Sequence, residues 1–68
     1  MVEVFKTDAT KHKEAMLLTA LYEAFPMYRI NFDLEDCDHI LRIEGDSICN
    51  EKVIGLMSAY NCFCDVLE

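Results

Sequence analysis

A strict alternation of apolar and polar side chains over residues 28–34 constrains the fold more than any other feature of the chain. The apolar members are Tyr28, Ile30, Phe32 and Leu34, and the polar members between them are Arg29, Asn31 and Asp33. Because successive side chains of a strand point to opposite faces, this pattern predicts a β-strand with one buried and one wet face. A second alternating run covers residues 39–44, after a short polar segment, and the two runs together predict a β-hairpin.

Two stretches with helical periodicity flank this hairpin. Apolar residues recur at three- and four-residue steps from Ala15 to Phe25 and again from Val53 to Tyr60, which predicts two amphipathic helices. Pro26 ends the first helix, because the residue before a proline is displaced from helical geometry. Asn61 ends the second, since asparagine tolerates the left-handed conformation that follows a helix.

Short strands at residues 2–6 and 62–67 complete a β-α-β-β-α-β order. This order predicts an α+β fold: a ferredoxin-like two-layer sandwich with a four-stranded antiparallel sheet and both helices on one face. Residues 1–68 then form a single domain. A chain of this length buries only ~60% of its unfolded surface, but its 53% hydrophobic content supplies the material for a core.

The charge balance and the absence of common motifs exclude several classes of function. Thirteen acidic and six basic side chains give a net charge of −7, which opposes binding to nucleic acid and to anionic membrane surfaces. No apolar run approaches the ~20 residues of a membrane span, and the N-terminus lacks the pattern of a signal peptide, so we expect a cytoplasmic protein. Because no nucleophile motif or glycine-rich phosphate loop is present, we expect no enzyme.

The element order resembles the heavy-metal-associated domain family, the fold of small copper chaperones and of the N-terminal modules of metal-pumping ATPases. The resemblance covers nearly the whole chain and rests on residues 21–26 (LYEAFP), 30–34 (INFDL) and 58–62 (SAYNC). The specific motif of that family is M-x-C-x-x-C, between the first strand and the first helix. An ungapped count back from Pro26 aligns Ala9 with its methionine.

The same count aligns Lys11 and Glu14 with the two cysteines of the motif, and His12 lies between them. The resemblance therefore implies a degenerate member whose loop binds no metal cofactor, because soft ions such as Cu(I) prefer sulfur ligands. Lys11 and Glu14 are three residues apart on a first helical turn, where they can form an ion pair instead.

Four cysteines, at positions 37, 49, 62 and 64, include no C-x-x-C pair. We expect free thiols, since the chain lacks the secretion signal that usually accompanies a disulfide scaffold. Cys62 and Cys64 would lie on one face of the closing strand. Three interpretations stay open: small core side chains, displaced ligands of a soft-metal carrier that binds Cu(I) or Zn(II), or redox-active thiols.

The uncovered face of the sheet is the candidate for an interface. If the helices cover the face that carries Val2, Val4, Leu41 and Ile43, then Phe5, Ile40 and Phe63 project from the open side. A contiguous exposed apolar patch commonly marks an interaction surface. The sequence therefore predicts a small non-enzymatic binding module that forms a homodimer or binds another protein through this open face, with the soft-metal carrier as the alternative.

Overall fold

The computed structural model describes residues 1–34 and 39–67 and has the predicted order of elements. Its strands are β1 (Val2–Thr7), β2 (Arg29–Asp33), β3 (Ile40–Glu44) and β4 (Cys64–Val66), and its helices are α1 (Lys11–Ala24) and α2 (Asn50–Ala59). The predicted polar turn at 35–38, which includes Cys37, lies outside the described residues.

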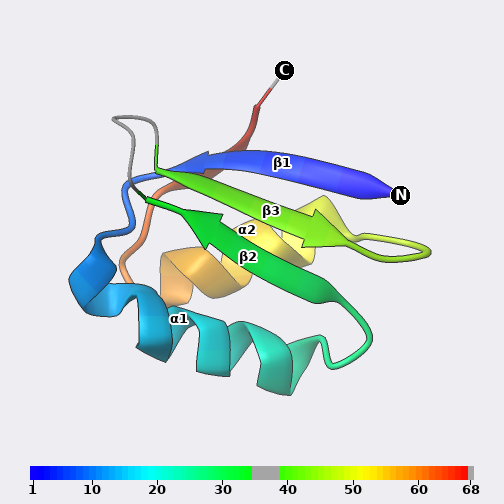
Figure 1. The fold of residues 1–68 in the computed structure, drawn as a ribbon, viewed down its shortest axis with the longest axis horizontal. Coiled ribbons are helices and arrows are strands. Elements are labelled where there is room, and N and C mark those ends of the chain that lie inside the picture. The colour runs from blue at the N-terminus through cyan, green and yellow to red at the C-terminus, as the bar shows by residue number, and fades with distance from the viewer. Residues whose placement is uncertain (35–38, 68) are drawn as a thin grey trace.

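The four strands form one antiparallel sheet in the order β2-β3-β1-β4. This is the strand order predicted for the ferredoxin-like arrangement, with β1 between β3 and β4. Both helices lie on the same side of the sheet (Figure 1), with α1 against β2 and α2 against β4. The result is the predicted two-layer α+β sandwich. Within the part of the chain that the structure describes, no helix is long and apolar enough to cross a bilayer.

The register of the strands determines which side chains face the helices. Phe5 lies opposite Leu41, and Ile30 lies opposite Ile43. Because directly opposed residues of an antiparallel pair share a face, these four side chains all point toward the helices. Tyr28 and Leu34 are also buried and Phe32 is half-buried, so the predicted face of β2 is confirmed.

The predicted face of β1 is wrong. Phe5 is completely buried, whereas Val2 and Val4 point to the open side of the sheet. Val4 and Phe5 are adjacent apolar residues, so the local pattern of β1 fits either face. A shift of one residue inverts every side chain of a strand, and the observed choice buries the larger phenylalanine.

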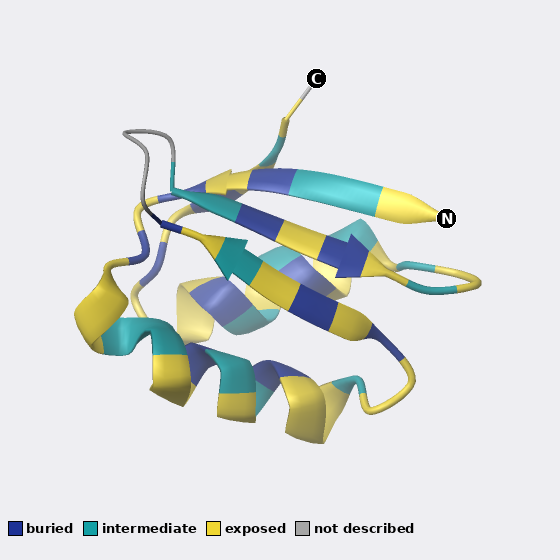
Figure 2. Ribbon diagram, viewed as in Figure 1, coloured by how far each residue is buried: buried dark blue, intermediate teal, exposed yellow. Residues whose placement is uncertain are grey.

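The core lies between the sheet and the helices, and Figure 2 shows the buried positions alternating along the strands. Leu17 and Leu21 of α1 and Val53 and Met57 of α2 are fully buried in it. Of the apolar residues that recur at helical spacing from Ala15 to Phe25, Leu21 is buried, while Leu18 and Phe25 are half-buried.

The end of α2 confirms the role predicted for Asn61. Its φ angle is 58°, in the left-handed region. The Asn61 N–H donates to the Ser58 carbonyl and the Cys62 N–H to the Met57 carbonyl, both at 2.9 Å. These two bonds form a Schellman motif, and they direct the chain from α2 into β4.

Candidate functional site

The connection between β1 and α1, where the resemblance places the metal loop, is closed by hydrogen bonds around Ala9. Ala9 is fully buried, and its N–H donates to Thr7 Oγ1 at 3.1 Å. The Thr7 hydroxyl in turn donates to the His39 carbonyl at 2.7 Å. Nδ1 of His39 bonds to the Ala9 carbonyl oxygen, an acceptor, so this bond requires the proton on Nδ1.

His39 holds this loop from the start of β3, and its backbone has a left-handed φ of 47°. A non-glycine residue in that region is uncommon and is retained where the surrounding contacts require it. The sequence assigned no role to His39, because its partner Ala9 lies 30 positions away. Only the pairing of β1 with β3 brings the two together.

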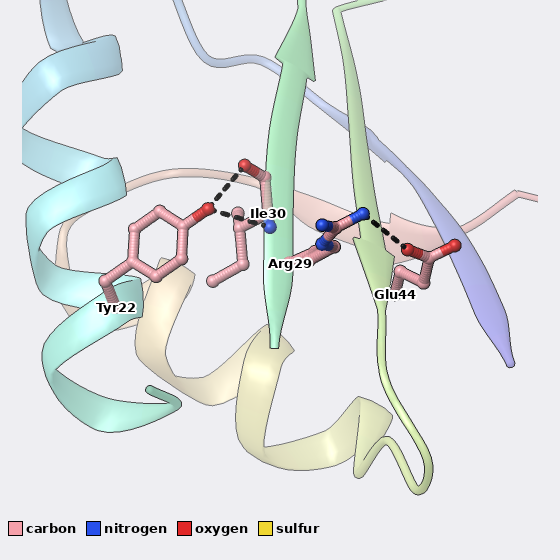
Figure 3. Close-up of polar contacts among 4 residues, drawn as sticks. All are labelled: Tyr22, Arg29, Ile30 and Glu44. Carbon is pink, nitrogen blue, oxygen red and sulfur yellow. Dashed lines mark hydrogen bonds and ion pairs between the residues drawn. The ribbon is translucent and has the colours of Figure 1, made fainter. Parts of the chain in front are cut away.

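The other residues of the predicted loop are more accessible than Ala9. Lys11 and His12 are exposed and Glu14 is half-buried. The ion pair suggested for Lys11 and Glu14 is absent: across residues 1–34 and 39–67, the one ion pair joins Arg29 to Glu44 at 3.8 Å (Figure 3). The bonds around Ala9, and not a pair of charges, close the loop.

Cys62 and Cys64 lie in the core beside this loop. Cys64 pairs with Thr7, and Sγ of Cys62 lies 3.6 Å from the Phe63 carbonyl oxygen and also contacts the Asp8 carboxylate. Burial raises the pKa of the Cys62 thiol to about 11, and the Asp8 carboxylate adds to this rise. Burial likewise raises the pKa of Cys64 to about 12.

Both thiols are therefore protonated near neutral pH, whereas a metal ion binds the thiolate. Within the described part of the chain, no group of three or more His, Cys, Asp or Glu side chains is placed to hold a metal ion. A metal at Cys62 and Cys64 would have to displace two protons from buried groups.

Asp8 joins the same loop to the approach to β4. Its carboxylate accepts the Phe63 N–H at 2.8 Å, and its own N–H donates to the Phe63 carbonyl at 3.3 Å. The contact with the Cys62 thiol, together with the Phe63 N–H, lowers the pKa of Asp8 below its ordinary value. The Asp8 carboxylate thus links the β1–α1 connection to the segment that precedes β4.

The open face of the sheet is the second candidate site. It carries the outward side chains of all four strands: Val2, Val4 and Lys6 of β1, Arg29, Asn31 and Asp33 of β2, Ile40, Arg42 and Glu44 of β3, and Asp65 of β4. Phe63 precedes β4 on the same side, because burial alternates between it and its neighbours Cys62 and Cys64.

Charge is distributed unevenly between this open face and the rest of the molecule. The open face carries three basic side chains and three acidic ones, so its net charge is zero. The remainder of the chain therefore carries ten acidic and three basic residues and the whole net charge of −7. The open face itself therefore adds no net charge to the repulsion that an approaching acidic molecule meets.

Apolar surface is also present on this side. Phe63 is 55% exposed, Val2 is 49% exposed, and Val4 and Ile40 are half-buried. Of the three residues predicted to form the patch, Ile40 and Phe63 do lie on this side. Phe5 does not, since it faces the helices, and its place on β1 is taken by Val2 and Val4.

One cavity near this surface is too small for a typical ligand, and in another two of the charged side chains already form an ion pair. One of about 120 Å³ lies between β2 and β3, well below the ~300 Å³ of usual ligand sites. A larger depression of about 420 Å³ lies at the other end of these strands, lined by Met1, Met27, Arg29, Glu44, Gly45 and Asp46. Its Arg29 and Glu44 already neutralise each other. The open face is therefore better suited to another protein surface than to a small ligand.

Comparison of the chain with models of known protein families, with curated proteins and with solved structures finds no match. The function must be inferred from the geometry of these surfaces.

Proposed function

We propose that this chain is a small non-enzymatic interaction module that forms a homodimer through the open face of its sheet. The observation that carries the proposal is the exposed apolar surface of that side, on a face whose net charge is zero in a chain of net charge −7. Two copies that meet through their open faces bring together no net charge there. The helices are balanced as well, with two acidic and two basic side chains in α1 and one of each in α2, so the acidic excess lies outside both surfaces.

The apolar side chains of the open side supply a driving force. Full burial of a Val, Ile or Phe side chain stabilises an interface by about 1.5–3 kcal/mol, and Val2, Val4, Ile40 and Phe63 all have surface left to bury. Association entropy offsets much of this gain, so we expect a dimer of modest affinity. A two-fold axis is the commonest way to bury one patch against itself.

The proposed kinship with the heavy-metal-associated family fits this interpretation as a member that has lost its metal loop. Ala9 is locked in place by Thr7 and His39, so the loop needs no ion to hold its shape. Protonated thiols at Cys62 and Cys64 disfavour the alternative, a soft-metal carrier.

Sedimentation equilibrium from low to high micromolar concentration tests the homodimer. We expect a reversible dimer for the wild type and at least a tenfold weaker one for an open-face variant, Val4→Ser with Phe63→Ser. The matched control is Met16→Ser with Tyr60→Ser, which removes exposed apolar side chains from the helical side and leaves association unchanged. A monomeric wild type at high micromolar concentration in moderate salt contradicts the proposal.

Native mass spectrometry under reducing conditions, with and without Cu(I) and Zn(II), tests the alternative. We expect a dimer mass that neither ion changes. Stoichiometric metal binding that Cys62→Ser or Cys64→Ser abolishes would establish the carrier in place of the interaction module.

A further inference from the structure

The free edge of β2 is covered at one position by a tyrosine from α1. β2 is an outer strand of the sheet, and such an edge presents N–H and C=O groups that pair with another strand. The Tyr22 hydroxyl accepts the Ile30 N–H and donates to the Ile30 carbonyl, both at 3.1 Å. Figure 3 shows the Tyr22 ring reaching across to β2. One oxygen atom thus occupies both groups that a neighbouring strand would use.

The next position along this edge is open. Alternate residues of an antiparallel strand direct their backbone groups to the same side, so Phe32 points its N–H and C=O the same way as Ile30. No described residue bonds to these groups of Phe32. Without the Tyr22 hydroxyl, the backbone groups of both Ile30 and Phe32 would be free, and the edge of β2 would offer two positions for strand pairing.

The opposite edge of the sheet differs. β4 has three residues, and its Leu67 neighbour donates its N–H to the Val4 carbonyl. The Val66 N–H consequently points to the free side, where Oδ1 of Asp65 accepts it at 2.9 Å. This edge is short and blocked by its own side chain, so β2 is the edge that another strand could extend.

The side chains of β2 are complementary to a second copy of β2. In an antiparallel pair centred on Asn31, Ile30 lies opposite Phe32 of the second copy, and both direct their backbone groups toward the partner. The same register places Arg29 opposite Asp33 of the second copy, twice by symmetry. Opposite charges directly across a strand pair are favourable. The existing contact of Arg29 with Glu44 is long and exposed, and such pairs are weak.

We propose that the edge of β2 is a strand-addition surface for β2 of a second copy, and that the Tyr22 hydroxyl keeps it closed. Tyr22 is 42% exposed, so its side chain can leave the edge without opening the core. A chain that pairs through both its open face and this edge has two different two-fold contacts. Each copy can then bind two others, so the contacts alternate along an open-ended assembly. Tyr22 limits assembly to a closed dimer.

A factorial set of variants separates this edge from the open face. In the open-face variant (Val4→Ser with Phe63→Ser), adding Tyr22→Ala produces a concentration-dependent dimer at least tenfold tighter than the same protein with Tyr22. In the wild-type background, Tyr22→Ala produces species larger than a dimer. Met16→Ala, at another exposed position of α1, has neither effect. Pairing through the edge is measured in the variant that lacks the open-face contact. A failure of the edge proposal is therefore distinguishable from a failure of the open-face dimer.

Hydrogen exchange and charge substitution identify the contact. In the edge dimer, the Ile30 and Phe32 amides become protected as concentration rises. Arg29→Asp abolishes the dimer, because both charge pairs become repulsive, and Arg29→Asp with Asp33→Arg restores it. Tyr22→Phe keeps the ring and loses only the hydroxyl, so the Ile30 amide of the monomer exchanges at least tenfold faster. The proposal is overturned if folded Tyr22→Ala remains monomeric near millimolar concentration, if the charge variants behave alike, or if Ile30 exchange in Tyr22→Phe is unchanged.

Discussion

Phe5 and Phe63 lie on opposite sides of the sheet. Phe5 has no exposed surface, whereas Phe63 is 55% exposed. The side chain of Phe5 is opposite Leu41, under the helices, and Phe63 is on the side that they leave uncovered. At the scale of single residues, the assignment of faces therefore makes a direct prediction about stability.

We expect Phe5→Ala to lower the free energy of unfolding by about 3–5 kcal/mol, the usual effect of removing a buried phenylalanine ring. That loss is a large part of the 5–15 kcal/mol typical of a whole domain. Phe63→Ala is the control and, at a protein concentration low enough to keep the chain monomeric, should change the unfolding free energy by no more than about 0.5 kcal/mol. Urea denaturation measures both. Equal effects of the two substitutions would mean that β1 faces the other way.

The cysteines also differ residue by residue. Cys49 is exposed, while Cys62 and Cys64 are buried, and their pKa values are raised to about 11 and about 12. Since the thiolate is the reactive form, at pH 8 only roughly one Cys62 in a thousand is reactive even where reagent can reach it. We therefore expect iodoacetamide to alkylate Cys49 much faster than either buried thiol. Peptide mapping by mass spectrometry over time measures this order, and early modification of Cys62 would show that the thiol is accessible and activated.

At the scale of elements, the two glycines have opposite surroundings. Gly55 is an exposed residue of α2, and a Cβ built there meets no atom within 4 Å. Gly45 follows β3, and a Cβ there would lie 2.8 Å from Cδ1 of Tyr28. The Tyr28 ring is fixed, because it stacks on Phe25 with centroids 5.1 Å apart and its hydroxyl accepts the Cys49 N–H at 3.2 Å.

Alanine at these two positions should consequently act in opposite directions. Gly55→Ala should raise the free energy of unfolding by about 0.5–1 kcal/mol, since glycine in a helix interior is unfavourable relative to alanine. Gly45→Ala should lower it by about 1–3 kcal/mol through overpacking against Tyr28. Chemical denaturation of the pair compares them directly, and a stabilising Gly45→Ala would contradict the described contact with Tyr28.

At the scale of the whole molecule, charge is the dominant feature. The open face is neutral, and the net charge of −7 belongs to the rest of the chain. Two copies in a face-to-face dimer still repel each other through these more distant charges. Such repulsion acts through solvent and is screened by salt, with a Debye length of about 10 Å at 0.1 M.

Association through the open face should therefore strengthen as salt is raised from about 20 to about 200 mM. Sedimentation equilibrium across this range measures the trend. Weaker association in salt would indicate that attractive charge pairs hold the dimer together, and would place the contact elsewhere than on the neutral open face.

The sequence by itself determined the elements, their order and the face of every strand with an unambiguous pattern. Residues 28–34 alternate without exception, so β2 could have only one buried face. Asn61 marks the end of α2 because few other residues tolerate its left-handed backbone. These features depend on side chains within a few positions of one another, and local physical chemistry is enough to predict them.

The tertiary structure decided what depends on distant partners. β1 could bury either Val4 or Phe5, and its pairing with Leu41 of β3 made the choice. His39 reaches Ala9 across 30 positions, and Tyr22 reaches the free edge of β2 only once α1 has packed against the sheet. The candidate surfaces of this protein arise from such contacts, because register and packing bring together residues that no local pattern relates.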